Sequence, residues 1–187
     1  SLTQNDGWNV YNLATKENQT LRAREIVHID GELETLLGKS DLVLTAMGAN
    51  QLTHWAQQIR EPLCKRLRSG NLDLILAENH PKPAAAVRAA LIDGATESER
   101  NLIAENLGVA QAQVLRSCIE PTAQQHPLTV QVQDHWTLPL DGDALVTTIS
   151  IEGFELKPNF ERELTRKLFT YNCVNAMVCY IGHLAGY

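Results

Sequence analysis

The sequence of 187 residues lacks the cysteine patterns of disulfide-stapled and zinc-binding proteins. Its four cysteines, Cys64, Cys118, Cys173 and Cys179, form no CxxC pair, and no group of histidines and cysteines has the spacing of zinc ligands. Cys173 and Cys179 stand six residues apart on a predicted helix, which does not bring them close enough to bridge. We therefore expect four reduced cysteines, no metal site and a cytoplasmic protein.

An excess of positive charge is absent as well, and a secretory signal is not expected. The formal net charge is −6 and the pI is about 5.5, so the composition gives no reason to expect nucleic acid or an anionic membrane as a partner. The N-terminal segment SLTQNDGWNV has neither the basic region nor the apolar run of a signal peptide.

Charged side chains are also missing from the C-terminal segment. Residues 168–187 contain no carboxylate, lysine or arginine, and this segment has the length of a transmembrane helix. Asn172, Asn175 and His183 interrupt it, and it continues from a charged amphipathic stretch. A helix buried in a protein core is therefore expected here in preference to a membrane span.

No glycine-rich phosphate loop of the form GxGxxG occurs, but the apolar pattern is that of an α/β protein. Residues 41–48 (DLVLTAMG) and 72–79 (LDLILAEN) are continuous apolar runs, as expected of strands buried on both faces. Helices are expected over residues 31–38, 50–69 with a kink or break at Pro62, 83–92, and 96–107, the last with a capping box of Thr96 and Glu99 and a stop at Gly108.

The remaining segments predict a second group of strands and a long helix. Residues 8–14 and 24–30 are expected to form a hairpin, residues 113–119 a strand, residues 127–136 a half-exposed antiparallel strand, and residues from about Glu155 onward a helix. The fold class is therefore α/β, with a parallel sheet, an antiparallel annex and a long C-terminal helix. In such sheets ligands bind beyond the carboxyl ends of the strands, which here are Met47-Gly48 and Glu78-Asn79.

Three polar residues on the C-terminal helix could carry chemistry. If Lys167 defines zero degrees on an α-helix, Asn175 lies at about 80° and Asn172 at about 140°, so the three polar groups are expected on one side of the helix among apolar neighbours. A lysine held among apolar groups has a lowered pKa and can take a proton from an alcohol near neutral pH, while amides can hydrogen-bond the resulting oxygen. The alternative from spacing alone is that Lys167 extends to solvent and the asparagines pair with backbone groups.

The stretch KLFTYNCVNAMVCYIGHLAG, residues 167–186, resembles the segment around the catalytic lysine of the polyol-specific long-chain dehydrogenases, the mannitol dehydrogenase family. The likeness extends to DLVLTAMG, to LILAEN and to the GFEL and RKLFT motifs. This resemblance implies that residues 1–150 form the later part of a Rossmann-type dinucleotide-binding domain. It also implies that residues 151–187 form the first helix of the substrate domain.

The resemblance also implies an activity and a set of site residues. Lys167 would be the general base, and Asn172 and Asn79 would hold the substrate oxygen that becomes the carbonyl. Met47, Gly48 and Glu78 would bind the cofactor. The family transfers a hydride between a sugar alcohol, or its phosphate, and NAD or NADP, without a metal.

The sequence departs from the family pattern at two sites. Asn175 stands where the family has a histidine, and Val114-Leu115-Arg116 replaces a Val-Asp-Arg. The glycine fingerprint and the helical C-terminal domain of the family are not recognisable, so little activity is expected of this chain alone, and it should bind NAD weakly or not at all. Two alternatives remain open: a non-catalytic homologue that acts as a binding or regulatory module, and a scaffold that associates with other chains through an exposed core surface. In addition, a homo-oligomer or association with further segments is expected, because an incomplete parallel sheet leaves an unpaired strand edge.

Overall fold

The computed structural model describes residues 7–26, 29–78, 80, 82–119 and 128–187, and its centre is a three-stranded parallel sheet. The strands β3 (Leu42–Thr45), β4 (Leu72–Leu76) and β5 (Leu107–Gln111) lie in the order β3-β4-β5. The predicted pairing of the runs 41–48 and 72–79 is confirmed, with Val43 opposite Leu74. The Rossmann-type α/β fold class is confirmed with it.

Strand β4 is buried on both faces, and its side chains alternate between two cores. Leu72, Leu74 and Leu76 belong to the larger cluster, whereas Ile75 packs with Ala112 and Leu140 in a smaller one. This is the period of two that a strand imposes. The continuous apolar run LDLIL in the sequence therefore reflects a strand with a layer of structure on each side.

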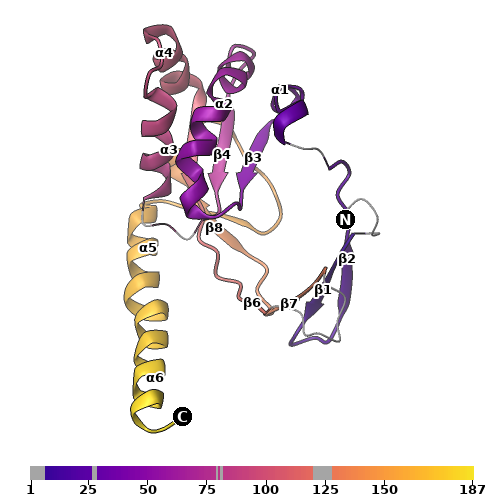
Figure 1. Ribbon diagram of the computed structural model, residues 1–187, viewed down its shortest axis with the longest axis vertical. Coiled ribbons are helices and arrows are strands. Elements are labelled where there is room, and N and C mark those ends of the chain that lie inside the picture. The colour runs from indigo at the N-terminus through magenta and orange to yellow at the C-terminus, as the bar shows by residue number, and fades with distance from the viewer. Residues whose placement is uncertain (1–6, 27–28, 79, 81, 120–127) are drawn as a thin grey trace.

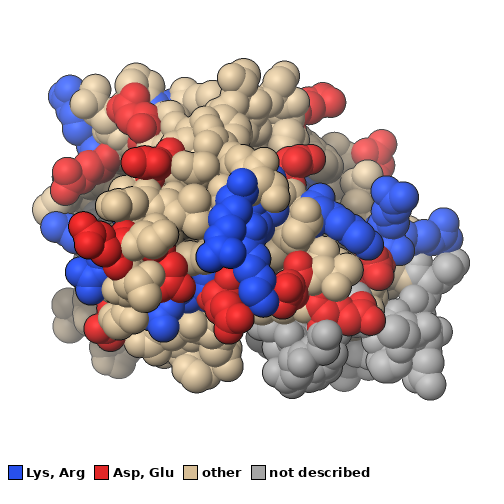
Figure 2. Space-filling view, turned by 90° about the horizontal axis from the view of Figure 1, so that it is seen from above, with Lys and Arg blue, Asp and Glu red and all other residues tan. Residues whose placement is uncertain are grey.

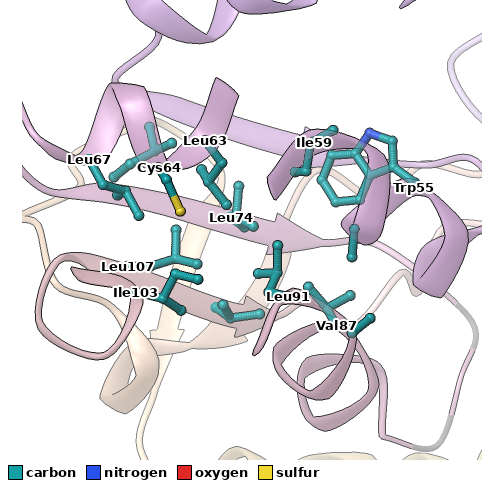
Figure 3. Close-up of a cluster of buried hydrophobic side chains, with 14 of the residues drawn as sticks. Trp55, Ile59, Leu63, Cys64, Leu67, Leu74, Val87, Leu91, Ile103 and Leu107 are labelled. Atoms are coloured by element: carbon teal, nitrogen blue, oxygen red, sulfur yellow. The ribbon is translucent and has the colours of Figure 1, made fainter. Parts of the chain in front are cut away.

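Helices cover the face of the sheet that carries the larger cluster (Figure 3). They are α1 (Ile29–Lys39), α2 (Leu52–Leu67), α3 (Pro83–Ile92) and α4 (Glu97–Asn106). Figure 3 shows Trp55, Ile59, Leu63, Cys64 and Leu67 of α2 facing Leu74, Val87, Leu91, Ile103 and Leu107. The capping box of Thr96 and Glu99 is present at the start of α4, as predicted.

Two predictions about these helices are wrong in part. Pro62 does not split α2, because Ile59 and Leu63 on either side of it are fully buried and hold both halves of the helix against the sheet. Gly108 does not end α4. The helix ends at Asn106, and Leu107 and Gly108 already belong to β5, where Gly108 pairs with Asp73 of β4.

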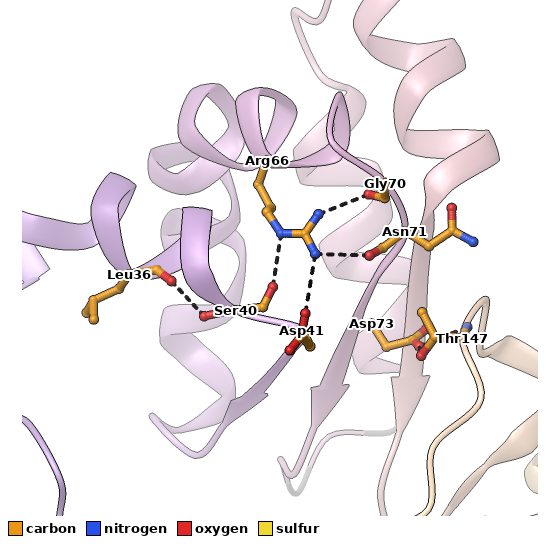
Figure 4. Close-up of polar contacts among 8 residues, drawn as sticks. All are labelled: Leu36, Ser40, Asp41, Arg66, Gly70, Asn71, Asp73 and Thr147. Carbon is orange, nitrogen blue, oxygen red and sulfur yellow. Dashed lines mark hydrogen bonds and ion pairs between the residues drawn. The ribbon is translucent and has the colours of Figure 1, made fainter.

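Arg66 fixes the amino-terminal edge of the sheet (Figure 4). The Arg66 side chain is only 11% exposed. Its guanidinium donates to the backbone carbonyls of Ser40, Gly70 and Asn71 at 2.9, 3.1 and 3.2 Å. These carbonyls lie at the ends of α1 and α2 and before β4. One planar group with several donors thus joins the turns that lead into two neighbouring strands.

A second, mixed sheet lies apart from the first in Figure 1 and has the order β2-β1-β7-β6. It contains β1 (Trp8–Asn12), β2 (Asn18–Leu21), β6 (Cys118–Ile119) and β7 (Thr129–Val132). The expected antiparallel pairing of β7 is found with β6, but its other neighbour, β1, runs parallel to it. Residues 113–117, which were predicted to extend the strand β6, are not in a strand.

The N-terminal hairpin is present, but its second strand is residues 18–21 and not 24–30. The Asn12 side-chain oxygen accepts from the N–H groups of Ala14 and Thr15, and Lys16 adopts a positive φ of 63°. This side-chain-stabilised turn reverses the chain earlier than the sequence pattern indicates. Ile29 and Asp30, at the end of the predicted strand, begin α1 instead, and residues 27 and 28 lie outside the described part.

A third pair of strands covers the second face of the parallel sheet. The strands β8 (Leu138–Asp141) and β9 (Phe154–Lys157) are parallel, and Leu140 and Phe154 pack against Ile75. The prediction that residues from Glu155 onward are helical is therefore wrong for residues 155–159. Alternating Phe154, Glu155, Leu156 and Lys157 form a strand, and the helix begins at Phe160.

The chain ends in α5 (Phe160–Lys167), a π-helical segment η4 (Leu168–Asn172) and α6 (Cys173–Leu184), which form a single rod that extends away from the α/β body (Figure 1). The long C-terminal helix was predicted, but its burial in a core was not correct. Phe169, Tyr180 and Leu184 are 76, 72 and 86% exposed, because no described element packs along this part of the rod. Among the described residues, no helix is long and apolar enough to cross a membrane.

Charges of both signs are interspersed on the surface seen from the top of Figure 1 (Figure 2). Lysine and arginine side chains alternate there with aspartate and glutamate, and no broad region of one sign is visible on this face. This distribution matches the modest net charge of −6.

Asp73 links the sheet to the strands on its second face. This residue of β4 is fully buried, and its carboxylate accepts from the N–H groups of Val146 and Thr147 at 2.9 and 3.1 Å and from the Thr147 hydroxyl. The carboxylate has room because its strand partner is Gly108: a Cβ atom at position 108 would lie 1.7 Å from Oδ1 of Asp73. Burial of a charged group requires such partners.

The variant Gly108→Ala is therefore expected to lower the free energy of unfolding by about 1 to 3 kcal/mol, because the new methyl group displaces the Asp73 carboxylate from its donors. Gly38→Ala is the control: it lies in α1 with no heavy atom within 4 Å of the added Cβ, and should stabilise by up to about 1 kcal/mol. Urea unfolding followed by circular dichroism measures both. Equal effects of the two variants would contradict the role given to Gly108.

Candidate functional site at the carboxyl edge of the sheet

The carboxyl ends of β3, β4 and β5 lie at one edge of the parallel sheet, as they must in strands that run in the same direction. Thr45 is followed by Met47 and Gly48, Leu76 by Glu78, and Gln111 by Gln113 and Val114. The crevice outside such an edge is where ligands bind in open α/β folds. The residues predicted to bind a cofactor therefore lie at one edge in the fold.

Glu78 connects the turn after β3 to the end of β4. Its two carboxylate oxygens accept from the N–H groups of Met47 and Gly48, each at 2.9 Å, and the residue is only 8% exposed. Gly48 has a φ of 93°, a conformation that favours glycine, and it leads through the 3₁₀ turn η2 (Ala49–Gln51) into α2. Glu78, predicted as a cofactor ligand, thus directs both oxygens at the protein's own backbone.

Thr45 is a residue of this edge that the sequence reasoning did not select. It is 2% exposed, and its hydroxyl has no hydrogen-bond partner in the part of the chain that the structure describes. Its carbonyl accepts from the Ala77 N–H at 3.1 Å. A threonine in an otherwise apolar strand just before a glycine turn was the signal available in DLVLTAMG. Buried hydroxyls without partners are uncommon and point to a site with unused bonding capacity.

Lys167 contacts the segment that follows β5. Its amine donates to the Val114 carbonyl at 3.0 Å, and the side chain is half-buried. Desolvation lowers the Lys167 pKa from the usual value of 10.5, because burial disfavours the charged amine. No carboxylate of the described residues forms an ion pair with it. The structure therefore brings the predicted base to the carboxyl side of the sheet.

Two buried side chains hold α5 in this position. Gln113 is 2% exposed and donates through Nε2 to the Glu163 carbonyl at 3.1 Å, while Phe160 is 3% exposed at the start of the helix. The Asn159 N–H donates to the Asp143 carboxylate at 2.9 Å just before the helix begins. Gln113 was not predicted as a site residue, yet it is the buried polar link between the end of β5 and the helix that carries Lys167.

The predicted amide ligands are less integrated into the edge. Asn172 and Asn175 are exposed on the rod beyond Lys167. Asn79, the third predicted amide, lies outside the described residues, so its position relative to Lys167 stays a prediction. The described structure places Glu78, Met47 and Gly48 together and joins Lys167 to Val114. It leaves Asn172 and Asn175 without contacts to these groups.

Arg116 and Trp136 form a further cluster near Val114 that the sequence reasoning missed. The Arg116 guanidinium lies 4.4 Å from the centre of the Trp136 ring, and its Nε donates to the Gln133 carbonyl at 2.9 Å. The Trp136 indole N–H and the Asn12 amide both donate to Asp134, at 2.6 and 2.9 Å. The hydrogen bond from Asn12, followed by that from Trp136, lowers the Asp134 pKa. This cluster connects the mixed sheet to the segment after β5.

Replacing Glu78 by glutamine should release the turn after β3. Glutamine keeps one acceptor but presents an amide NH₂ to a backbone N–H. We therefore expect the free energy of unfolding to fall by about 1 to 3 kcal/mol and hydrogen exchange at the Met47 and Gly48 amides to become faster. Glu105→Gln, on the exposed surface of α4, is the matched control and should change neither quantity. Unchanged exchange at both amides in Glu78→Gln would show that the carboxylate does not hold the turn.

Comparison with known proteins shows the family to which the chain belongs. The family model of the mannitol dehydrogenase Rossmann domain matches residues 1–153. Mannitol-1-phosphate 5-dehydrogenases are similar to the chain. The protein of Bacillus licheniformis is 33% identical over 160 residues, that of Clostridium acetobutylicum 29% over 160, and that of Thermoanaerobacter pseudethanolicus 24% over 180.

These alignments cover 83, 83 and 91% of this chain but 41, 41 and 45% of the relatives, so the chain spans less than half their length. The family match nevertheless includes all three strands of the parallel sheet and the turn that Glu78 holds. The chain belongs to the mannitol dehydrogenase family, and its residues 1–153 correspond to the Rossmann domain of that family.

Proposed function

We propose that the chain contributes the cofactor-binding edge and the catalytic lysine of an NAD(P)-dependent dehydrogenase that interconverts a sugar alcohol, or its phosphate, and the corresponding ketose. The observation that supports this most directly is the Lys167 amine, which is partly desolvated and lies against the segment after β5 without a carboxylate partner among the described residues. The names of the relatives, mannitol-1-phosphate 5-dehydrogenases, indicate the substrate class.

Two domains divide this work in the proposal. Residues 1–150 belong to the Rossmann-type dinucleotide-binding domain, and residues 151–187 begin the substrate domain with its first helix. The family match over residues 1–153 supports the first assignment, and the start of the C-terminal rod at Phe160 supports the second. Lys167 then lies on the substrate side of the junction and contacts the cofactor side through Val114.

The edge fits the nicotinamide end of NAD or NADP better than the diphosphate. Met47 and Gly48 are exposed there, no heavy atom lies within 4 Å of a Cβ added at Gly48, and the buried Thr45 hydroxyl has no partner among the described residues. Met47 and Gly48 would hold the nicotinamide end, with Glu78 fixing their backbone. The sequence contains no GxGxxG loop for the diphosphate. A bound NAD or NADP would supply the acceptor for the hydride of the alcohol carbon.

The chain's own residues supply the proton transfer and the orientation. Lys167, in its neutral form, takes the proton from the alcohol oxygen as the carbonyl forms. Asn172 and Asn79 donate hydrogen bonds to that oxygen, and Asn175 contacts a neighbouring hydroxyl. The Val114 carbonyl accepts one N–H of Lys167 and so fixes the direction of the amine.

A non-catalytic homologue is the second candidate, and two observations favour it. Asn175 cannot titrate, whereas a histidine can, and Leu115 supplies no acidic group beside the carbonyl that Lys167 contacts. In that case the edge would bind a nucleotide or a polyol without turnover.

Lys167→Met in the full-length protein should lower kcat by on the order of 10² to 10⁴, because the proton acceptor is lost while the apolar stem is kept. In the unmodified protein the oxidation rate should rise with pH through the lowered Lys167 pKa, because only the neutral amine accepts a proton. The measurement is NAD(P)H absorbance during oxidation of mannitol 1-phosphate and mannitol. Lys39→Met, an exposed lysine of α1, is the control. Full activity of Lys167→Met would refute the assignment of the base.

Asn175→His should raise kcat on the best polyol, by up to about 10², because an imidazole at this position adds a hydrogen-bonding group that also titrates. KM should change less than kcat if the imidazole acts in the transition state. An absence of hydride transfer in both proteins, together with polyol or nucleotide binding that survives Lys167→Met, would favour the non-catalytic candidate. Ordinary turnover in the parent with no gain in the variant would show that asparagine suffices.

A further inference from the structure

The three polar residues of the C-terminal rod would spread over about 140° of an unbroken α-helix, which is one side of the helix but wider than a single face. Asn172 and Asn175 follow Lys167 by five and eight residues. At 3.6 residues per turn these positions stand at about 140° and about 80° from Lys167. Residues that share a helix face are instead three, four or seven positions apart. In an unbroken α-helix, Asn172 would point away from the direction of the Lys167 side chain.

The π-helical segment η4 lies between Lys167 and Asn175 and changes this relation. It spans Leu168–Asn172, and in such a turn the backbone hydrogen bond closes between residues i and i+5 instead of i and i+4. One extra residue is therefore accommodated without a corresponding rotation of the face. Positions five and eight after Lys167 take the directions that positions four and seven have in an α-helix, which all lie on one side.

Side-chain contacts fix the rod on both sides of the start of this turn. The Thr170 hydroxyl donates to the Arg166 carbonyl at 2.6 Å, so it satisfies a carbonyl of the last turn of α5, where the hydrogen-bond pattern changes. Lys167 is held by Val114, and α5 is held by Gln113. Because the residues of α6 other than Gly182 are exposed, the direction of Asn175 depends on the turn that precedes it.

We infer that the π turn is a positioning element that brings Asn172 and Asn175 onto the face of Lys167. Its purpose rests on the proposed function, in which an amine and amides act on neighbouring oxygens of one polyol. Its geometry rests only on the spacing of the residues, the π-helical hydrogen-bond pattern and the Thr170 contact.

Engineered histidine pairs test the geometry without any activity. Two histidines chelate a divalent metal when they lie one above the other on a helix face, as at i and i+4 of an α-helix. The pair Lys167→His with Asn172→His is compared with the pair Lys167→His with Tyr171→His, both in a Cys173→Ala, His183→Ala background, because the native Cys179 and His183 have an i, i+4 spacing on α6. The probe is Ni²⁺, and binding is measured by calorimetry and by the metal-induced rise in Tm. The pair Asn175→His with Cys179→His, within α6 and in the same His183→Ala background, is the positive control for an ordinary α-helical turn.

The 167/172 pair should bind Ni²⁺ at least about tenfold more tightly than the 167/171 pair. Tighter binding by the 167/171 pair would show an α-helical turn and overturn the inference. Equal binding, or none by either pair while the control pair in α6 binds, would also overturn it. The result is independent of the Lys167→Met kinetics, so failure of the geometry and failure of the proposed activity are distinguishable.

Thr170→Val gives a second test in the same background. Valine keeps the branched shape of threonine but removes the hydroxyl that donates to the Arg166 carbonyl. The preference for the 167/172 pair should then fall toward unity, while the helix content measured by circular dichroism stays the same. A preference that is unchanged in Thr170→Val would show that the hydroxyl does not support the turn.

Discussion

The burial of β4 on both faces is the constraint on which the rest of the structure depends. A strand in this position cannot leave a polar side chain unpaired, because no water reaches it. Asp73 therefore takes three donors from Val146 and Thr147, and these bonds hold the chain between β8 and β9 against the second face of the sheet. Glu78, just beyond the end of the strand, takes two donors from the turn after β3. Two carboxylates thus organise opposite ends of one segment.

The position of Lys167 follows from the same constraint through several steps. Strand β5 ends at Gln111, and the buried Gln113 then bonds to the backbone of α5. The segment before α5 is strand β9, which pairs with β8 and packs over Ile75 of β4. The helix consequently begins at the sheet, and its last α-helical residue is Lys167, beside Val114. Beyond that residue the rod has no described support, which agrees with the exposure of its apolar side chains.

The sequence predicted the elements whose signal is local and missed those that depend on tertiary contacts. Continuous apolar runs identified β3 and β4, and the spacing of Thr96 and Glu99 identified the start of α4. Strand β5 was hidden because Gly108 is typical of a helix stop. Glycine is needed at position 108 because the Asp73 carboxylate lies opposite it on the neighbouring strand, and no local sequence pattern indicates that contact.

The candidate site was predictable to a similar degree. The family motif singled out Lys167, whose role stays a prediction, and the strand ends singled out Met47, Gly48 and Glu78, which the structure places together. The inward use of Glu78 could not be foreseen, because it requires knowledge that β3 and β4 are neighbours in register. The π turn was equally hidden, since a helical wheel assumes one uniform rotation per residue.

The contact between Lys167 and Val114 bears on how the base would be oriented without a histidine. A charged amine has three N–H donors and no lone pair, whereas the neutral amine keeps donors and gains an acceptor site. In both forms one N–H can remain on the Val114 carbonyl, so the orientation of the amine does not depend on its protonation state. Desolvation alone then adjusts the pKa, because no opposite charge among the described residues favours the charged form. Orientation by a backbone carbonyl is thus compatible with asparagine at position 175.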